Sequence, residues 1–473
     1  MKVLSIDQGT TGTKAFTLDE QGQFKKIANF EHKQIYPEQG WVEHDAEELL
    51  AHIVACIKKA GKVDAIGIAN QGETLVAWDS ETGKPIYNAI VWQDDRTKLT
   101  TEKLKADGAQ ALTLAKAGLP LDPYFSASKM RWIIENVDGA EGLAQQHRLR
   151  LGTSDAFFLA RLTGNFVTDI TTASRTSLMS LETLQWDQDL CELFGIPISC
   201  LPEIKPTAGF FGTYGKSPIT ANMVDQQAAL YGHGCHLPGD AKITFGTGAF
   251  ALAITGNDRP QNNQQGLLPT VAWAMQDRPP LFAIDGGIYN AASAVNWAKS
   301  LGLFTDYAEI NQFKAESALQ RGLVFVPALS GLACPHWDRS AAGLWLGLGL
   351  DTTKHDMMQA LLEGIAMRAA EVLQAMAKLG AKGQSISIDG GLAANEYFCQ
   401  FLSNALNRIV KVAGSPDLTA LGLARMTMKG AGQVDLPPLP PPRRLYAPDA
   451  PISAALHARF GIAILRSKGW KNF

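Results

Sequence analysis

A carboxylate followed by a turn of glycines and threonines lies near the start of the chain. The apolar run from Val3 to Ile6 ends at Asp7, and the segment QGTTGTK (residues 8–14) leads into an alternating run over residues 15–18. Glycine lets backbone N–H groups approach a phosphate closely, and threonine hydroxyls add hydrogen-bond donors. Asp7 is suited to Mg²⁺, which prefers oxygen ligands and keeps several waters. On its own, this pattern is also that of an ordinary hairpin turn.

The same arrangement occurs a second time, near the middle of the chain. The segment ITFGTGAFAL (residues 243–252) is an apolar run that turns through Gly246-Thr247-Gly248 and continues as a strand. Both copies are strand–turn–strand patterns, unlike the strand–turn–helix of Rossmann and Walker nucleotide loops. Repetition of such an element indicates two related domains. The pair therefore predicts two phosphate-binding turns that close on one nucleotide.

Length and composition exclude several classes of protein. The chain has 473 residues, which is too many for one hydrophobic core, so two domains are expected. The net charge of −3 does not indicate binding to nucleic acid or to an anionic membrane surface, which usually requires excess positive charge. The six cysteines are scattered without a CxxC pair, which indicates reduced thiols. Since we find no signal peptide and no run that could cross a bilayer, we expect a cytoplasmic protein without membrane insertion.

Strands and helices alternate around the first turn, which predicts an α/β fold. Helical spacing of apolar residues predicts a helix over 46–60, capped by Asp45. A buried strand is predicted over 63–69, and the segment NQGET (residues 70–74) follows at its carboxyl end, where ligand groups collect in open α/β sheets. Strands over 75–78 and 89–92 come next, and we expect a helical region to start at Asp94.

Other candidate residues follow predicted strands in the second half of the chain. Asp225 ends the strand predicted over 219–225 and precedes a helix over 226–231, a position that also suits a plain helix N-cap. A helix over 290–300 carries Asn296, and a long amphipathic helix over 356–378 is expected to be core. The strand starting at Ile386 runs into the Gly390-Gly391 turn, and we expect the following helix to contain Asn395. Glycines at such a turn allow close packing against an adenine.

Many motifs of the chain resemble those of the FGGY carbohydrate kinase family, most closely its glycerol kinases. They run from residue 1 to about residue 430 and include YPEQGWVEHD, NQGETLVAWDSETGKPIYNAIVWQDDRT, DPYFSASKMRWIIENV, TDITTASRTSLMSLETLQWD, VDQQAALYGHG, FGTGAFALAITG, GLVFVPALSGLACPHWD and DGGLAANEYF. The resemblance implies two actin-like, RNase H-like domains with the active site in a central cleft. The expected boundaries are 1–232 for the polyol-binding domain and 233–435 for the nucleotide-binding domain. We expect residues 436–473, a Pro-rich segment and a terminal helix, to pack on the second domain.

The resemblance also implies ATP-dependent phosphorylation of a terminal hydroxyl on a small polyol, glycerol or a near relative, with Mg²⁺. Asp225 matches the catalytic aspartate of the family, and Asp7 the metal-orienting one. The substrate-binding positions are Gly72, Glu73, Trp92, Tyr124, Asp225, Gln226 and Phe250. The nucleotide-binding positions are Gly9, Thr10, Thr11, Thr13, Lys14, Gly246, Thr247, Gly248, Asn296, Gly390, Gly391 and Asn395.

Gly72 departs from the family pattern, because glycerol kinases usually carry arginine at this position. A charge-assisted hydrogen bond contributes roughly 1.5–3 kcal/mol. Its loss leaves two alternatives open: a longer polyol such as erythritol or a pentitol, or glycerol with a water in place of the guanidinium. A kinase of xylulose or ribulose fits less well, because the matches around Trp92 and Tyr124 are glycerol-kinase-like. An actin-like ATPase would lack the polyol-binding set, and a non-catalytic sensor would lack Asp7 or Asp225.

Two further segments concern regulation and partners. Residues 210–218 are shorter than the glycine-rich insert by which bacterial glycerol kinases bind an inhibitory sugar bisphosphate, so we predict no inhibition by fructose 1,6-bisphosphate. Residues 436–444 are Pro-rich, and we favour a linker to the helix predicted over 452–467 above a docking motif for a partner. Kinases of this type form homodimers or homotetramers, but the sequence identifies no interface.

Overall fold

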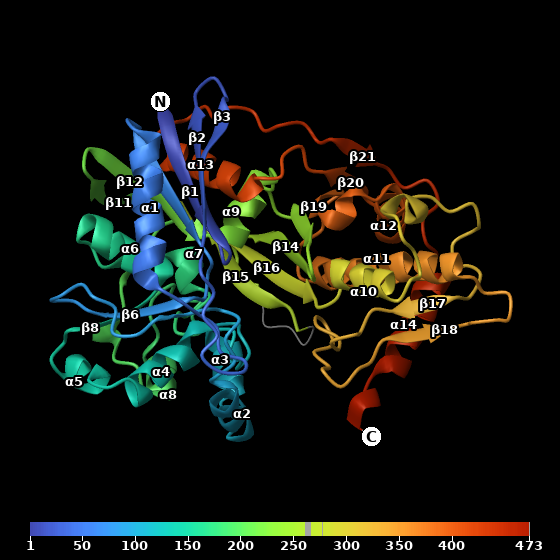
Figure 1. Cartoon of the computed structure of the whole chain (residues 1–473), viewed down its shortest axis with the longest axis horizontal. Coiled ribbons are helices and arrows are strands. Elements are labelled where there is room, and N and C mark those ends of the chain that lie inside the picture. The colour runs from blue at the N-terminus through green and yellow to red at the C-terminus, as the bar shows by residue number, and fades with distance from the viewer. Residues whose placement is uncertain (261–265, 277, 473) are drawn as a thin grey trace.

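Two lobes make up the molecule (Figure 1). The computed structural model of the chain describes residues 1–260, 266–276 and 278–472. The first lobe, coloured blue to green in Figure 1, contains the N-terminal half of the chain, and the second lobe is coloured mainly yellow to red. Each lobe is built around one large sheet that contains both parallel and antiparallel strand pairs.

The first sheet has six strands in the order β11-β12-β5-β1-β2-β3. β5 is parallel to both β1 and β12, whereas the pairs β1–β2, β2–β3 and β11–β12 are antiparallel. The helix α1 (Ala46–Ala60) packs on this sheet, and the Asp45 carboxylate caps it by accepting hydrogen bonds from the N–H groups of Glu47 and Glu48. The strands span Lys2–Gln8 (β1), Gly12–Asp19 (β2), Phe24–Glu31 (β3), Ala65–Asn70 (β5), Ala208–Tyr214 (β11) and Ser217–Val224 (β12).

The second sheet repeats this topology in the order β15-β16-β14-β13-β19-β20-β21. β13, β14 and β16 form the antiparallel meander that β1, β2 and β3 form in the first lobe, and β19, β20 and β21 correspond to β5, β12 and β11. The internal repeat predicted from the two turns is therefore present. The strands span Ala241–Phe245 (β13), Ala249–Gly256 (β14), Leu268–Trp273 (β15), Leu281–Ile288 (β16), Ser385–Gly390 (β19), Ile409–Val412 (β20) and Arg444–Tyr446 (β21).

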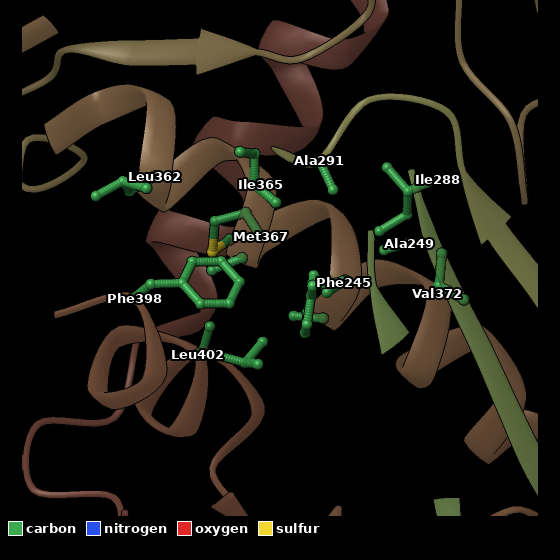
Figure 2. Packing of buried hydrophobic residues seen from close by; sticks show 14 of the residues in the cluster. Phe245, Ala249, Ile288, Ala291, Leu362, Ile365, Met367, Val372, Phe398 and Leu402 are labelled. Atoms are coloured by element: carbon green, nitrogen blue, oxygen red, sulfur yellow. The ribbon is translucent and has the colours of Figure 1, made fainter. Parts of the chain in front are cut away.

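The largest hydrophobic core fills the second lobe (Figure 2). Figure 2 shows members of this core from the sheet (Phe245 and Ala249), from the long helix α11 (Lys354–Lys378; Ile365) and from α12 (Glu396–Leu406; Phe398 and Leu402). Helices α10 (Ala292–Ser300) and α14 (Ala454–Ser467) also pack against this core. The apolar side of the long helix is buried as its periodicity predicts.

Smaller elements complete the two lobes. Below the first sheet, a four-stranded sheet in the order β4-β7-β6-β8 is surrounded by short helices. Its strands span Glu43–His44 (β4), Leu75–Asp79 (β6), Ala89–Ile90 (β7) and Leu149–Thr153 (β8). The helices of this region span Lys98–Ala106 (α2), Gln110–Lys116 (α3), Ser126–Asn136 (α4), Ala140–Gln145 (α5) and Gln188–Phe194 (α8). Ser154–Thr163 (α6) packs on the first sheet, and Ile170–Ala173 (α7) contacts β12 and β15. Two-stranded pairs are formed by Val167–Asp169 (β9) with Glu203–Lys205 (β10), and by Val324–Val326 (β17) with Leu344–Leu346 (β18).

Two helices in close contact connect the lobes. α9 (Asp225–Gly232) follows β12, and α13 (Leu418–Gly430) lies across it although it comes from the far end of the chain. A Cβ on Gly422 would lie 1.9 Å from the Ala228 carbonyl oxygen, so glycine alone allows this approach. α13 also packs on β1, β5 and β12 and thereby covers a face of the first sheet.

A few expected elements differ from the structure. The helical region expected at Asp94 begins only at Lys98, because the Asp94 carboxylate accepts a hydrogen bond from the Val42 N–H and pairs with Arg96. Asn395 does not lie within a helix but caps α12, and a short 3₁₀-helix (Gly391–Ala394) precedes it. The strand expected over 89–92 ends at Ile90.

Two global expectations can be compared with the structure. All six cysteines are buried. In the part of the chain that the structure describes, every helix is too short or too polar to cross a lipid bilayer.

Candidate active site

The first turn, residues 9–13, is held in place from several sides. The register of β1 and β2 places Asp7 opposite Lys14, and the Gly9 N–H donates to the Gly12 carbonyl. A Cβ on Gly12 would lie 2.6 Å from the Phe30 carbonyl oxygen. Trp92 Nε1 donates a hydrogen bond to Thr10 Oγ1 at 2.9 Å, which ties the turn to the predicted polyol-binding set.

The second turn, residues 246–248, is hydrogen-bonded to the start of α10. The Gly246 carbonyl accepts a hydrogen bond from the Ala292 N–H, and the Thr247 carbonyl accepts from Ala291 and Ser293. A Cβ on Gly248 would lie 2.5 Å from the Ile288 carbonyl oxygen, so this turn also requires glycine. The two turns therefore occupy equivalent positions in the two repeats.

A cavity of about 230 Å³ lies between the lobes and is called here the interlobe cavity. First-lobe residues meet residues of β14, β15 and β16 around it. Six predicted polyol-binding residues line it: Glu73, Trp92, Tyr124, Asp225, Gln226 and Phe250. The lining also contains Thr10 of the first turn, together with Gln71, Arg175, Val224, Gln227, Ala251, Leu252, Thr270 and Asp285.

Asp225 is the first residue of α9 and faces this cavity. Its Oδ1 accepts a hydrogen bond from the Gln226 N–H at 2.7 Å. Burial, assisted by the charges of Asp7 and Glu73, raises the pKa of the Asp225 carboxyl to about 7. A carboxyl group whose pKa lies near neutrality is well suited to accept a proton from a hydroxyl.

Asp7 lies at the end of β1 in a region crowded with carboxyl groups. Burial raises its pKa to about 6, the Asp417 charge acts in the same direction, and Lys14 opposes them. Excess negative charge of this kind fits a bound cation. Among the described residues, no group of three His, Cys, Asp or Glu side chains is arranged to hold a metal. Mg²⁺ does not require such a group, since one or two carboxylates, phosphates and waters commonly hold it.

Glu73 is paired with an arginine that the sequence reasoning did not identify. Arg175 Nε donates to Glu73 Oε1 at 2.7 Å, and both side chains are about 95% buried. Arg175 Nη2 donates to Asp285 Oδ2 of the second lobe at 3.2 Å. Its guanidinium lies over Tyr124, whose ring meets Trp92 edge-on with centroids 5.5 Å apart. The cavity wall therefore combines an ion-paired arginine with two adjacent aromatic rings.

Gly72 adopts a left-handed backbone conformation, with φ of +63°. A Cβ built there would meet Val224 Cγ1 at 3.5 Å, an ordinary contact, and Gly72 is not among the residues that line the interlobe cavity. The structure thus places Gly72 beside the cavity, and the cation nearest to Glu73 is Arg175.

The predicted nucleotide-binding residues of the second lobe lie around the end of β19 and on α10. Gly390 has φ of +88°, and a Cβ there would lie 2.2 Å from the Phe245 carbonyl oxygen. Gly391 has open space around it. The Asn395 amide donates to the Ile310 carbonyl and accepts from the Phe398 N–H, and Asn296 Oδ1 accepts from the Tyr307 hydroxyl. Both amide side chains are therefore engaged within the protein.

In the first turn, the predicted phosphate-binding side chains differ in how far they are exposed and in whether they already have a partner in the protein. Thr13 is buried and its hydroxyl lies 3.2 Å from His32 Nε2, whereas Thr11 is exposed. Lys14 Nζ lies 3.9 Å from the Asp417 carboxylate, which comes from the start of α13.

The sequence reasoning also missed Lys242 of β13. Its ammonium group is buried and donates to Gln226 Oε1 at 2.5 Å and to Thr244 Oγ1 at 3.2 Å. Burial lowers the pKa of Lys242, while the nearby carboxylates of Asp389 and Asp225 act in the opposite direction. Lys242 directly precedes the apolar run predicted from Ile243, and no local pattern marked its side chain as buried.

Comparison with known proteins gives a consistent result. The profile of the N-terminal domain of the FGGY family of carbohydrate kinases matches residues 2–232, and that of its C-terminal domain matches residues 241–431. A glycerol kinase of Saccharopolyspora erythraea is 42% identical over 443 residues, which cover 89% of this chain and 88% of that protein. The structure resembles Plasmodium falciparum glycerol kinase with ADP, with a TM-score of 0.92, 30% identity and 98% of each chain covered. A xylulose kinase from Rhodospirillum rubrum shares the fold, with a TM-score of 0.87, 22% identity, and 98% of this chain and 99% of that chain covered.

Proposed function

This chain belongs to the FGGY family of carbohydrate kinases, and we propose that it transfers the γ-phosphoryl group of ATP to a terminal hydroxyl of glycerol. The predicted family, the two-domain α/β fold and the ATP-dependent kinase activity on a polyol or sugar are confirmed. Glycerol itself is our proposal, supported by the names of the most similar proteins and by the interlobe cavity.

The observation that carries this proposal is the composition and size of the interlobe cavity. At about 230 Å³ it is below the range of about 300–1,000 Å³ of drug-sized sites, so it suits a small substrate. Carboxylates and an amide line it, and these groups bind hydroxyls. Trp92 and Phe250 add flat apolar surfaces for a carbon chain.

The arrangement supports direct in-line phosphoryl transfer, which depends on positioning and charge stabilisation. Asp225 accepts the proton of the attacking hydroxyl, while Glu73 and Gln226 hold the substrate in the cavity. Backbone N–H groups of the two turns would bind the β- and γ-phosphates. Asp7 would hold Mg²⁺, which would supply charge neutralisation at the phosphate oxygens. Enclosure by both lobes excludes water, which protects ATP from hydrolysis.

A longer polyol such as erythritol or a pentitol is the second candidate substrate. Gly72 favours it, because this position lacks the arginine side chain that would otherwise limit the space near the substrate. A ketose kinase has only the fold-level likeness to xylulose kinases in its favour.

We also propose the division into domains at 1–232 and 233–435, with 436–473 packing on the second domain. α14 lies in the core of the second lobe, which supports the assignment of the terminal segment. We place the enzyme in the cytoplasm, where ATP is available, and expect a homodimer or homotetramer.

The test is release of ADP from Mg-ATP with glycerol, erythritol, ribitol, arabinitol, xylulose and ribulose. We expect glycerol to give the highest kcat/KM. A longer polyol that is better by tenfold, about 1.4 kcal/mol, would replace glycerol as the substrate. No reaction with any member of the panel would overturn the proposed function.

A further inference from the structure

One arginine side chain reaches carboxylates of both lobes at the interlobe cavity. Arg175 Nε donates to Glu73 Oε1 at 2.7 Å in the first lobe, and Nη2 donates to Asp285 Oδ2 at 3.2 Å in the second lobe. Only 4% of the side chain is exposed, and this remaining surface lines the cavity. A buried guanidinium between two carboxylates is held in one orientation.

Arg175 keeps donor capacity that the protein does not use. A guanidinium has five N–H groups, and Nε with one Nη2 N–H accounts for the two hydrogen bonds. Within the described residues, Nη1 makes no hydrogen bond to the protein. Because Arg175 lines the interlobe cavity, this unused donor is available to a ligand there.

The local fold fixes where this side chain starts. Arg175 follows α7, whose first turn is capped by the Asp169 carboxylate. The preceding Ser174 shares a hydrogen bond with Thr270 of β15, with their hydroxyl oxygens 2.9 Å apart. The backbone at Arg175 is therefore tied to the second lobe directly beside the cavity.

We propose that Arg175 is the cation that binds a non-reacting hydroxyl of the polyol in this enzyme. It supplies the guanidinium that the sequence lacks at Gly72, from a different segment of the chain. Glu73 and Asp285 position it, and the neighbouring Glu73 carboxylate is free to accept a hydrogen bond from the same hydroxyl. This inference rests on the proposed polyol kinase function and adds a specificity residue to it.

The backbone at Gly72 supports the proposal that Arg175 supplies the guanidinium that is missing at position 72. A side chain there would start from a left-handed backbone, which L-residues rarely adopt, and its Cβ would face Val224. Arg175 already donates a hydrogen bond to Glu73, and its guanidinium lies over the rings of Tyr124 and Phe125. Arg175 can therefore donate a hydrogen bond to a polyol hydroxyl although Gly72 has no side chain to do so.

The experiment measures kcat/KM of wild type and Arg175→Ala with glycerol, 1,2-propanediol and 1,3-propanediol. Each diol lacks one hydroxyl of glycerol, so the preference of wild type for glycerol reports the binding of that hydroxyl. We expect R175A to lower kcat/KM for glycerol by about 10- to 150-fold, the loss of one charge-assisted hydrogen bond. The preference for glycerol over one of the diols should fall by a similar factor, because that diol never had the hydroxyl that Arg175 binds.

Controls separate binding from folding. Arg96→Gln removes another buried arginine, which pairs with Glu43 and Asp94 and does not line the cavity. It is expected to lower thermal stability while leaving the preference for glycerol over both diols unchanged. Arg175→Lys keeps the charge and much of the volume, and it should retain part of the preference if R175A fails to fold.

The outcomes are distinguishable. If wild type phosphorylates polyols but R175A and R175K keep the wild-type preference over both diols, Arg175 has only a structural role and the inference is wrong. If wild type prefers a longer polyol, the same comparison is made with its deoxy analogues. If wild type phosphorylates no polyol, the proposed function fails first, and this inference fails with it.

Discussion

At the scale of single residues, the site depends on carboxyl groups that the fold keeps away from water. Asp7, Asp225 and Glu73 come from three separate segments. Burial raises the pKa values of both aspartates, and the charges of Asp7 and Glu73 raise that of Asp225 further. Such an arrangement costs stability in the free protein and is characteristic of functional sites. A bound cation would relieve part of that cost, and so would a polyol whose hydroxyls donate hydrogen bonds to the carboxylates.

Asp225→Asn should abolish most of the activity. The amide cannot accept a proton from the attacking hydroxyl, so we expect kcat to fall by about 10²–10⁴-fold. The measurement is steady-state ADP release with glycerol, together with ADP binding by calorimetry, which should stay within about twofold of wild type. A kcat within tenfold of wild type would show that Asp225 is not the general base. Glu182→Gln, an exposed carboxylate, is the neutral control.

Two buried histidines beneath the first turn predict a dependence of stability on pH. Burial lowers the pKa values of His32 and His44 to about 4, below the usual 6.5. The folded protein therefore binds fewer protons than the unfolded chain between these values, so the histidine contribution to stability is complete above pH 6.5 and is lost as the pH falls toward 4. His52 faces His32 and Gln71 faces His44, and neither carries a negative charge that would favour protonation.

The check is the free energy of unfolding by denaturant at pH 7.5 and pH 5.0 for wild type and a His32→Gln/His44→Gln variant. We expect the loss between the two pH values to be smaller in the variant by about 1 kcal/mol per histidine, after allowance for partial solvent screening. Comparison with the variant cancels the opposite effect of Asp169 and Asp225, whose raised pKa values favour the folded state at low pH. Equal losses in both proteins would contradict the prediction.

At the scale of elements, helix contacts through glycine determine how the lobes are joined. Gly422→Ala should destabilise the protein by about 1–3 kcal/mol or more, since the new methyl group would lie 1.9 Å from the Ala228 carbonyl oxygen. The matched control is Gly461→Ala in α14, where the added methyl group meets no atom within 4 Å. That change should stabilise by about 0.5–1 kcal/mol, because alanine favours the helix. Denaturation midpoints of the two variants should shift in opposite directions, and shifts of equal sign would refute the packing argument.

Elements with a strong local pattern were predictable from the sequence. The two hairpins, the helix α1 with its Asp45 cap and the strand before Asp225 all appear where periodicity and turn residues indicated. Local rules failed where a tertiary contact decides the outcome: Asp94 binds the Val42 N–H and Arg96 in place of starting a helix, and Asn395 caps α12. Six of the predicted polyol-binding residues meet at one cavity, but their roles remain predictions.

The residues that sequence reasoning missed share a physical cause. Arg175 lies about 100 residues from Glu73 and from Asp285, so the ion pairs that define it exist only after the chain has folded. Lys242 is likewise defined by a tertiary contact, because its ammonium group donates a hydrogen bond to Gln226 of another element. Nothing in local periodicity or composition distinguishes such side chains from solvent-exposed ones.

At the scale of the whole molecule, the connection between β11 and β12 bears on regulation. Tyr214 pairs directly with Ser217, so only Gly215 and Lys216 form the turn. A two-residue turn has no extra backbone for an anion-binding loop of the kind expected in relatives inhibited by a sugar bisphosphate. We predict that fructose 1,6-bisphosphate at millimolar concentration leaves kcat/KM for the polyol within about twofold. Clear, saturable inhibition would refute this.

The position of α13 has a consequence for how the protein is made. Val3, Leu18 and Ala65 of the first lobe are covered by Leu421, Ala424 and Met428 of α13. Roughly 200 residues separate the end of β12 from this helix, which at about 5–20 residues per second takes the ribosome about 10–40 s to translate. During that interval the nascent first lobe has every strand of its sheet but lacks its cover. The apolar face is then open to chaperones or to neighbouring chains, so the first lobe completes its folding only when the second has almost been synthesised.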